Sequence, residues 1–234
     1  MSSPNVTIIL KLLADKSRMT ILDILMDGRA YTVNEITSFT KIKQHTVSYH
    51  LKLLTEANLT SVKKYGKFHY YSISDTLTPE LFEMLSQFSP MNPTKSYRQH
   101  VQKKEIKRAR TCYDHLAGEL GVEIRDFLTS KNIIVTDSQN KDKYIVSPNG
   151  KTFFKESLNI NIEELQKKKR NFCINCLDWS ERKNHIAGSL AKAIFDFLIE
   201  KKYIIQNPGT RAITITTDGE NFFKNSWHIT LSDE

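Results

Sequence analysis

The sequence has few cysteines, no long apolar run and no secretory pattern at its start. Three cysteines, an odd number, argue against a disulfide framework and fit a reducing compartment. No apolar run is long enough to span a bilayer, so we expect no membrane partner. The first residues lack the basic and apolar regions of a signal peptide, and we therefore expect a cytoplasmic protein.

Motifs of the common enzyme classes are also missing. The sequence contains no phosphate-binding loop, nucleophile elbow or metalloprotease motif. Cys176, His185 and Asp178 could in principle act as nucleophile, base and orienting group, so a cysteine-dependent enzyme stays an alternative. Without a recognisable catalytic motif, the prediction is a protein that is not an enzyme.

Positive charge is concentrated in one short segment of the chain, whose formal net charge is +8. Residues 1–89 hold ten basic against eight acidic residues, residues 90–110 hold seven against one, and residues 111–234 hold seventeen of each. This distribution favours one surface that contacts phosphates and a neutral domain with another role, although a solvated surface would look the same. A non-specific architectural DNA-binding protein is a weaker alternative, because such a protein needs no large neutral domain.

The first part of the chain shows the pattern of a helix-turn-helix. Apolar residues recur with helical spacing over residues 8–13 and 17–26, and a capping pattern opens a short helix at Thr32. A further helix is predicted over residues 44–57, with one apolar and one polar face. Two short helices joined by a tight turn, the second polar on one side, are typical of DNA binding; an ordinary helical hairpin is the alternative.

Two β-prone runs follow this helix and predict a hairpin with a basic tip. They lie at residues 61–64 and 68–73, where a wing would contact phosphates or the minor groove. In the major groove, Gln44 can pair with adenine, and its neighbours can reach bases or phosphates. The residues expected to contact DNA are Gln44, His45, Thr46, Ser48, Tyr49, Lys52, Lys63, Lys64 and Lys67.

These segments resemble the ArsR-type winged helix-turn-helix repressors over about residues 5–88. The resemblance rests on DKSRMTIL at 15–22, VSYHLKLL at 47–54 and GKFHYYSI at 66–73. It implies a homodimer that pairs through its first and last helices, here near residues 5–14 and 79–88. It also implies repression through double-stranded DNA with an inverted-repeat operator.

The sequence departs from this family in two ways. Lys43 stands where a serine or threonine usually caps the recognition helix. The metal ligands of the family are missing, since residues 33–39 contain no cysteine and residues 79–88 contain no histidine. If the protein senses an effector, another part of the chain must bind it.

The remainder of the chain contains an internal repeat. Residues 1–89 are the predicted DNA-binding and dimerisation domain, 90–110 a basic linker or helix, and 111–234 a duplicated sensory domain. The halves of this domain cover about residues 111–165 and 172–234, and Cys112, Asp114 and His115 of the first half match Cys176, Asp178 and His185 of the second. The motifs CYDHLAG at 112–118 and CLDWSER at 176–182 resemble those of the longer members of the family. The expected fold class is α+β, mainly helical, with two winged-helix-like halves in the second domain. Each half is predicted as a helix, two strands and a short apolar end.

The repeat brings matching polar residues together, and three interpretations stay open. In the first, Asp114 and Asp178 cap helices while the histidines and cysteines fill the core. In the second, the cysteines and histidines bind a transition metal such as zinc, or the site binds a small molecule. In the third, the cysteines form a thiol redox sensor. The candidate effector residues are Cys112, Asp114, His115, Cys173, Cys176, Asp178, Trp179, Arg182 and His185, and the candidate metal ligands are Cys112, Cys173, Cys176, His115 and His185.

Overall fold

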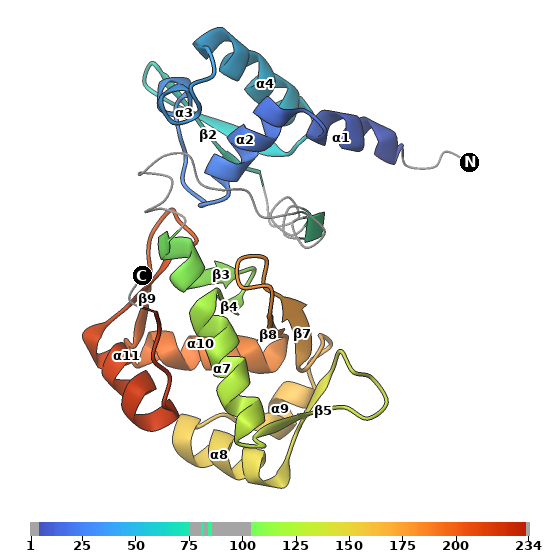
Figure 1. The fold of residues 1–234 in the computed structure, drawn as a ribbon, viewed down its shortest axis with the longest axis vertical. Helices are drawn as coiled ribbons and strands as arrows, with labels where there is room; N and C mark the ends of the chain where they lie inside the picture. The colour runs from blue at the N-terminus through green and yellow to red at the C-terminus, as the bar shows by residue number, and fades with distance from the viewer. Residues whose placement is uncertain (1–4, 75–80, 82–83, 86–103, 233–234) are drawn as a thin grey trace. The chain divides into compact units, whose positions relative to one another are not determined.

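The computed structural model describes residues 5–74, 81, 84–85 and 104–232. The chain divides into two compact units (Figure 1). The first includes Met1–Leu85, and the second includes Lys103–Asn207 and Ala212–Glu234. Residues 104–110, predicted as the end of a basic linker, are thus part of the second unit. In the described part of the chain, no helix is both long and apolar enough to cross a membrane.

Four helices form most of the first unit. They are α1 (Val6–Leu13), α2 (Lys16–Leu25), α3 (Val33–Thr40) and α4 (Gln44–Glu56). Thr32 and Glu35 form the predicted capping box at the start of α3, and Lys41, in the left-handed region with φ 59°, ends that helix. Lys43 precedes α4 and makes no side-chain capping bond, so the recognition helix begins without the usual cap.

An apolar core holds these helices together. Ile21, Leu25, Ile36 and Leu51 are inaccessible to solvent within it. The hairpin of β1 (Thr60–Tyr65) and β2 (Phe68–Ile73) follows α4, with Tyr65 paired to Phe68 across a tight turn. Gly66 in this turn has φ 58°, a conformation that glycine adopts readily. The first unit is therefore a winged helix-turn-helix, as predicted.

The second unit consists of two successive stretches of chain, and each stretch begins with a short hairpin. The first stretch contains β3 (Arg110–Cys112), β4 (His115–Ala117), α7 (Glu119–Ser130), β5 (Ile134–Thr136), β6 (Tyr144–Val146), α8 (Pro148–Leu158) and α9 (Ile162–Gln166). The second contains β7 (Ile174–Leu177), β8 (Asn184–Ala187), α10 (Ser189–Glu200), β9 (Ile204–Gln206), β10 (Ile213–Ile215), α11 (Thr217–Phe222) and the π-helix η1 (Phe223–Trp227). All sheets among the described residues are two-stranded and antiparallel.

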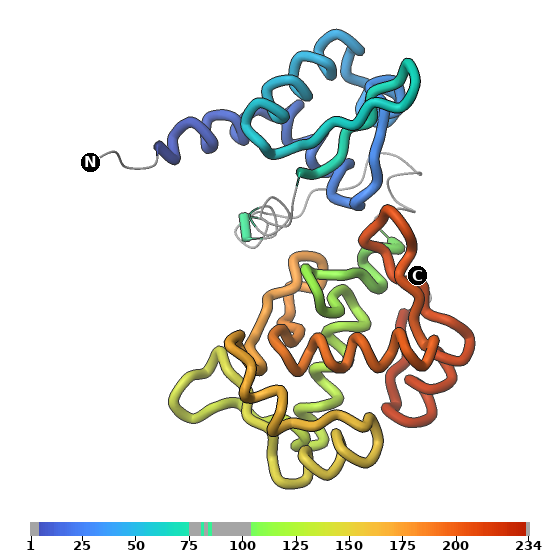
Figure 2. The backbone as a smooth tube through the Cα atoms, turned by 180° about the vertical axis from the view of Figure 1, so that it is seen from behind, coloured from blue at the N-terminus to red at the C-terminus, as the bar shows by residue number. Residues whose placement is uncertain are grey.

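The long helices α7 and α10 cross near the middle of the second unit (Figures 1 and 2). Their apolar faces contribute Leu120, Leu128, Leu190 and Leu198, each inaccessible to solvent, to one continuous core. Burial of each such side chain stabilises the fold by about 1.5–3 kcal/mol. This core supports the strands that precede the two helices.

The hairpins β3–β4 and β7–β8 correct two sequence predictions. Residues 112–117 form a hairpin that precedes α7, and were expected to begin a helix directly. Gly118 and Gly188 stand at the starts of α7 and α10, with φ 79° and 102° and no side-chain capping bond. Asp114 and Asp178 therefore do not cap the helices that follow them. Each half also ends in a helix, where a short apolar segment was predicted.

Candidate DNA-binding surface and buried cysteine–histidine cluster

The polar face of α4 is exposed, as DNA binding requires. The buried residues of this helix are Val47, His50, Leu51 and Leu54, which hold it against the core. The exposed side is formed by Gln44, His45, Ser48, Tyr49 and Lys52, with Thr46 half-buried. Because these side chains are exposed, the N-terminal half of α4 is accessible to the edges of bases.

Gln44 is held by a residue that sequence analysis did not identify. Its Nε2 donates a hydrogen bond to Asn34 Oδ1 of α3, at 2.9 Å. An amide nitrogen carries two hydrogens, so the second stays available for an acceptor on adenine while Oε1 can accept from the same base. Asn34 can therefore orient Gln44 for base contact. Asn34 lies at the start of α3, ten residues before Gln44 along the chain, and no sequence pattern indicated this role.

The wing carries exposed cations beside aromatic residues. Lys63, Lys64 and Lys67 are all exposed, and Lys67 Nζ lies 5.4 Å from the centre of the Phe68 ring. Tyr65 is 64% exposed at the tip of the hairpin. Cations at a wing can contact phosphates irrespective of sequence, which gives affinity that depends on salt.

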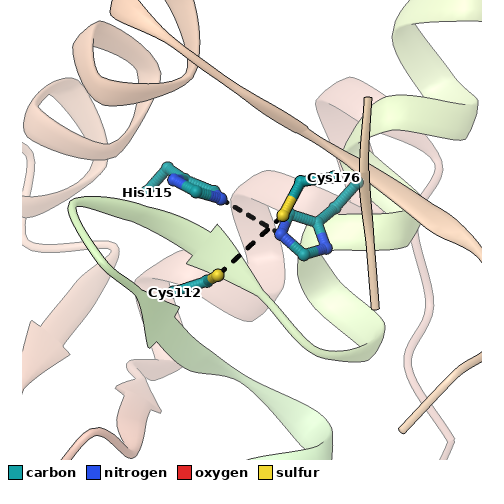
Figure 3. Close-up of side chains that lie close together, drawn as sticks. Cys112, His115 and Cys176 are labelled. Atoms are coloured by element: carbon teal, nitrogen blue, oxygen red, sulfur yellow. Dashed lines mark hydrogen bonds between the residues drawn. The ribbon is translucent and has the colours of Figure 1, made fainter. Parts of the chain in front are cut away.

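In the second unit, four of the candidate residues converge in a cluster. Cys112 pairs with His115 across β3–β4, and Cys176 pairs with His185 across β7–β8. The two sulfur atoms are 4.0 Å apart and the two histidine Nε2 atoms are 3.1 Å apart. All four donor atoms lie within 4.8 Å of one another. In Figure 3, the side chains of Cys112, His115 and Cys176 point toward a common centre. We call these four residues the Cys–His cluster.

A carboxylate stands behind each histidine of the Cys–His cluster. His185 Nδ1 lies 3.3 Å from Asp178 Oδ2, and His115 Nδ1 lies 3.6 Å from Asp114 Oδ1. Both Nδ1 atoms are buried, and neither carboxylate meets them in hydrogen-bond geometry. Nε2 of each ring thus faces the cluster while Nδ1 faces an acid.

Asp178 is fixed by a buried ion pair. Its Oδ2 lies 3.0 Å from Arg110 Nη2 and accepts a hydrogen bond from the backbone N–H of Gly118 at 2.7 Å. Burial opposes ionisation, but the contact with His185 and the charge of Arg110 hold the pKa of Asp178 well below its usual range. Arg110 is itself inaccessible to solvent, so this residue of the predicted basic segment 90–110 contributes no charge to the protein surface.

Asp114 is fixed in a similar way by a more exposed arginine. Arg170 donates to both carboxylate oxygens, at 2.5 and 3.1 Å. This bidentate contact holds the pKa of Asp114 below its usual range, although partial burial opposes the effect. Neither ion pair was predicted from the sequence, because the partners lie 68 and 56 residues apart along the chain.

The remaining candidate residues lie outside the Cys–His cluster. Cys173 is 2% exposed in the apolar core and is not one of the clustered donors. Trp179 and Arg182 belong to the turn between β7 and β8; Arg182 is exposed, and the Arg110 guanidinium lies 4.8 Å from the centre of the Trp179 ring. Of the two neighbouring candidate ligands Cys173 and Cys176, only Cys176 therefore belongs to this site.

Comparison with known proteins identifies the helix-turn-helix of the first unit. A helix-turn-helix domain family matches residues 13–63. An uncharacterized HTH-type transcriptional regulator of Bacillus subtilis, YdfF, is 39% identical over 229 residues, covering 98% of this chain and 100% of that protein. The arsenical resistance operon repressor of Staphylococcus aureus is 30% identical over 92 residues, covering 39% of this chain and 88% of its own length.

Solved structures similar to this chain include a winged helix-turn-helix. The homodimeric DNA-binding domain of Mb0332 from Mycobacterium bovis, a possible ArsR-family regulator, is 30% identical with a TM-score of 0.33, and covers 34% of this chain and 73% of that one. HlyU from Vibrio cholerae is 28% identical with a TM-score of 0.33, and covers 36% of this chain and 89% of its own.

The fold and the exposed face of α4 define the class: a DNA-binding transcription regulator with a winged helix-turn-helix. The chain belongs to the family of HTH-type transcriptional regulators, and within it to the ArsR type.

Proposed function

We propose that the protein is a sequence-specific, dimeric repressor that binds an inverted-repeat operator. The observation that carries the proposal is the polar, exposed N-terminal half of α4 next to the cationic wing. Base edges would be contacted by the helix, and phosphates by Lys63, Lys64 and Lys67. Repression is the function named for the arsenical resistance relative.

Exposed apolar residues on α1 support the proposed dimer. Val6, Ile8 and Leu10 are 61, 63 and 55% exposed, and Met84 in the second pairing segment is 58% exposed. Apolar side chains gathered on one short helix are a typical protein contact surface. A second copy of the chain is the proposed occupant, because two-fold pairing would present two α4 helices to successive major grooves. Most of the second predicted pairing segment, residues 79–88, lies outside the described residues.

Binding-site selection from random DNA tests this proposal with the full-length protein. We expect an enriched inverted repeat whose half-sites lie about 10 base pairs, or a multiple of that, apart. Footprinting of the selected site should protect both halves. Recovery of sequences without a shared motif would overturn sequence-specific binding, and a single unrepeated motif would overturn the dimeric arrangement.

We also propose that the second unit, with boundaries near 111–165 and 172–234, is a structural duplication. Its two halves share the element order of hairpin, helix, hairpin and helix. The backbone of Gly150 packs against the Ile133 carbonyl, where an added Cβ would lie 2.0 Å from the oxygen. Gly219 packs in the same way against Tyr203. Ser147 and Thr216 cap the helices at these two positions, which supports equivalence down to single hydrogen bonds.

Finally, we propose that this duplicated unit regulates DNA binding. An effector that binds or oxidises the second unit would change the half-site separation that the dimer prefers, and so weaken operator binding. Operator affinity can be measured before and after metal chelation, and after oxidation with diamide. A change of fivefold or more in either comparison, on the order of 1 kcal/mol, supports regulation. Equal affinity under all three conditions would overturn regulation through this unit's thiols or metal ligands.

A further inference from the structure

We propose that the Cys–His cluster binds one zinc ion with four protein ligands: the sulfur atoms of Cys112 and Cys176 and the Nε2 atoms of His115 and His185. Two thiolates and two imidazoles are a ligand set that zinc prefers over harder cations. This site differs from the metal boxes that residues 33–39 and 79–88 lack. The inference concerns the second unit alone and does not depend on how the first unit binds DNA.

The distances within the Cys–His cluster match a tetrahedron around a zinc ion. With Zn–S bonds of about 2.3 Å and Zn–N bonds of about 2.0–2.1 Å, the ligand atoms of a regular tetrahedron are separated by about 3.8 Å (S to S) and about 3.3 Å (N to N). The sulfur atoms are 4.0 Å apart and the Nε2 atoms 3.1 Å apart. Since all four atoms also lie within 4.8 Å of one another, small shifts of side chains would complete the site.

The carboxylates behind the histidines support the same assignment. An imidazole that binds zinc through Nε2 carries its proton on Nδ1, and this N–H usually donates to an acid or a carbonyl. Asp178 and Asp114 stand 3.3 and 3.6 Å from the two Nδ1 atoms. Arg110 and Arg170 in turn hold these carboxylates in place. Each histidine therefore has its own outer shell, which consists of one carboxylate and the arginine that binds it.

Hydrogen bonds among the four side chains alone do not explain why the two histidines converge in the Cys–His cluster. Two Nε2 atoms at 3.1 Å can share only one hydrogen bond, in which one ring donates and the other accepts. A zinc ion would satisfy both Nε2 atoms at once and leave each Nδ1–H directed at its carboxylate.

A disulfide between Cys112 and Cys176 is the competing assignment. Such a bond would require the sulfur atoms to approach from 4.0 Å to about 2.05 Å. It would explain the two cysteines but not the convergence of the two histidines on the same point. Zinc explains all four residues, and it needs no oxidant.

The zinc ion would connect the two halves of the second unit. Two ligands come from β3–β4 and two from β7–β8, the hairpins that begin the first and the second half. A site closed by four protein ligands has no open position for a substrate, so its role is structural or regulatory. Binding energy at such a site is folding energy, and we therefore expect zinc to stabilise this unit.

Metal analysis of full-length protein, purified under reducing conditions without chelator and reconstituted with Zn²⁺, tests the proposal. We expect one zinc per chain after removal of excess ion. The double variant Cys176→Ser/His185→Ala should lose it. Two single variants serve as matched controls and should retain it: Cys173→Ala removes a thiol outside the cluster, and His69→Ala removes an exposed histidine of the wing.

Cobalt substitution of the wild-type protein keeps the test decisive if the double variant fails to fold. Tetrahedral Co²⁺ with two thiolates should give strong visible d–d bands and sulfur-to-metal charge-transfer bands. Trp179 and Trp227 both lie in the second unit, so chelation should also lower the urea midpoint measured by tryptophan fluorescence. Absence of bound zinc, an octahedral cobalt spectrum, unchanged zinc in the double variant, or a Cys112–Cys176 disulfide in the reduced preparation would each overturn the assignment.

Discussion

Individual side chains have different roles in the two units. In the first, exposed polar residues such as Gln44 are available to contact DNA, and Asn34 orients that amide. In the second, the charges of Arg110 and Asp178 are completely removed from solvent. Removing an exposed side chain should therefore change recognition, whereas removing a buried charge should change stability.

Gln44→Ala should reduce base discrimination. Loss of a bidentate contact with adenine costs about 1–3 kcal/mol on the selected site and little on random DNA. Fluorescence anisotropy with both DNAs measures this difference. Lys67→Ala is the contrasting variant, because a phosphate contact should be lost equally on every sequence and lower the salt slope by about one. If Gln44→Ala weakened both DNAs equally, α4 would not be the recognition helix.

Arg110→Met should destabilise the second unit by about 3–5 kcal/mol, because it leaves the Asp178 carboxylate buried without its cation. Urea unfolding followed by tryptophan fluorescence reports on this unit alone.

The double-mutant cycle with Asp178→Asn gives the control for the ion pair. Asp178→Asn should cost less in the Arg110→Met background than in the wild type, since it then removes an uncompensated charge. Strictly additive costs would show that the two side chains act independently, against the geometry of the pair.

Cys173 should react with alkylating reagents far more slowly than a thiol in unfolded protein. Burial raises the pKa of Cys173 from 9.0 to about 12, which lowers its thiolate fraction at pH 8 by about a thousandfold. Iodoacetamide labelling followed by mass spectrometry measures the rate at each cysteine. Because the pKa of Cys173 is raised, labelling of this residue should stay slow at every pH below that at which the protein unfolds. Rapid labelling of native Cys173 at pH 8 would contradict its placement in the core.

At the scale of helices and strands, the first unit was predictable, and so were the strands that follow α7 and α10, but the hairpins β3–β4 and β7–β8 were not. Apolar spacing and the capping box of Thr32 identify helices because these signals extend over several residues. Strands β3 and β4 have three residues each, too few to display an alternating pattern. Tyr113, with φ 58°, occupies a left-handed turn position for which its residue type gives no sequence signal.

The candidate cluster was only partly predictable for a related reason. The repeat aligned Cys112 with Cys176 and His115 with His185, and these four side chains do converge. Their convergence depends on how two hairpins that are far apart in the sequence pack together, and no local sequence pattern predicts this packing. Cys173 illustrates the limit, because its spacing from Cys176 indicates a ligand pair while its side chain lies in the core.

The exposed face of α1 gives a prediction at this scale. Ile8→Lys should convert the dimer into a monomer and weaken operator binding, because a charge would be buried in the pairing surface. Light scattering coupled to size exclusion measures the mass. Ile205→Lys, at an apolar position of the second unit that is 49% exposed, is the matched control and should remain dimeric. A dimeric Ile8→Lys variant would exclude α1 from the interface.

In the whole molecule, the proposed recognition of DNA and the proposed regulation belong to different units. The helix-turn-helix family match covers residues 13–63, while the likeness to YdfF extends over 98% of the chain. YdfF therefore also contains the second unit. A purely architectural DNA-binding protein would not require this unit. The affinities of such a protein for its operator and for unrelated DNA differ by a factor that can be measured directly.

The ratio of affinities for the selected operator and for a scrambled duplex, measured at physiological salt, tests the central claim most directly. A sequence-specific regulator should prefer its operator by at least about 1000-fold. The preference should fall when Gln44 is replaced and persist when Lys67 is replaced. A ratio near one, together with affinity that collapses as salt rises, would instead identify a protein that coats DNA without regard to sequence.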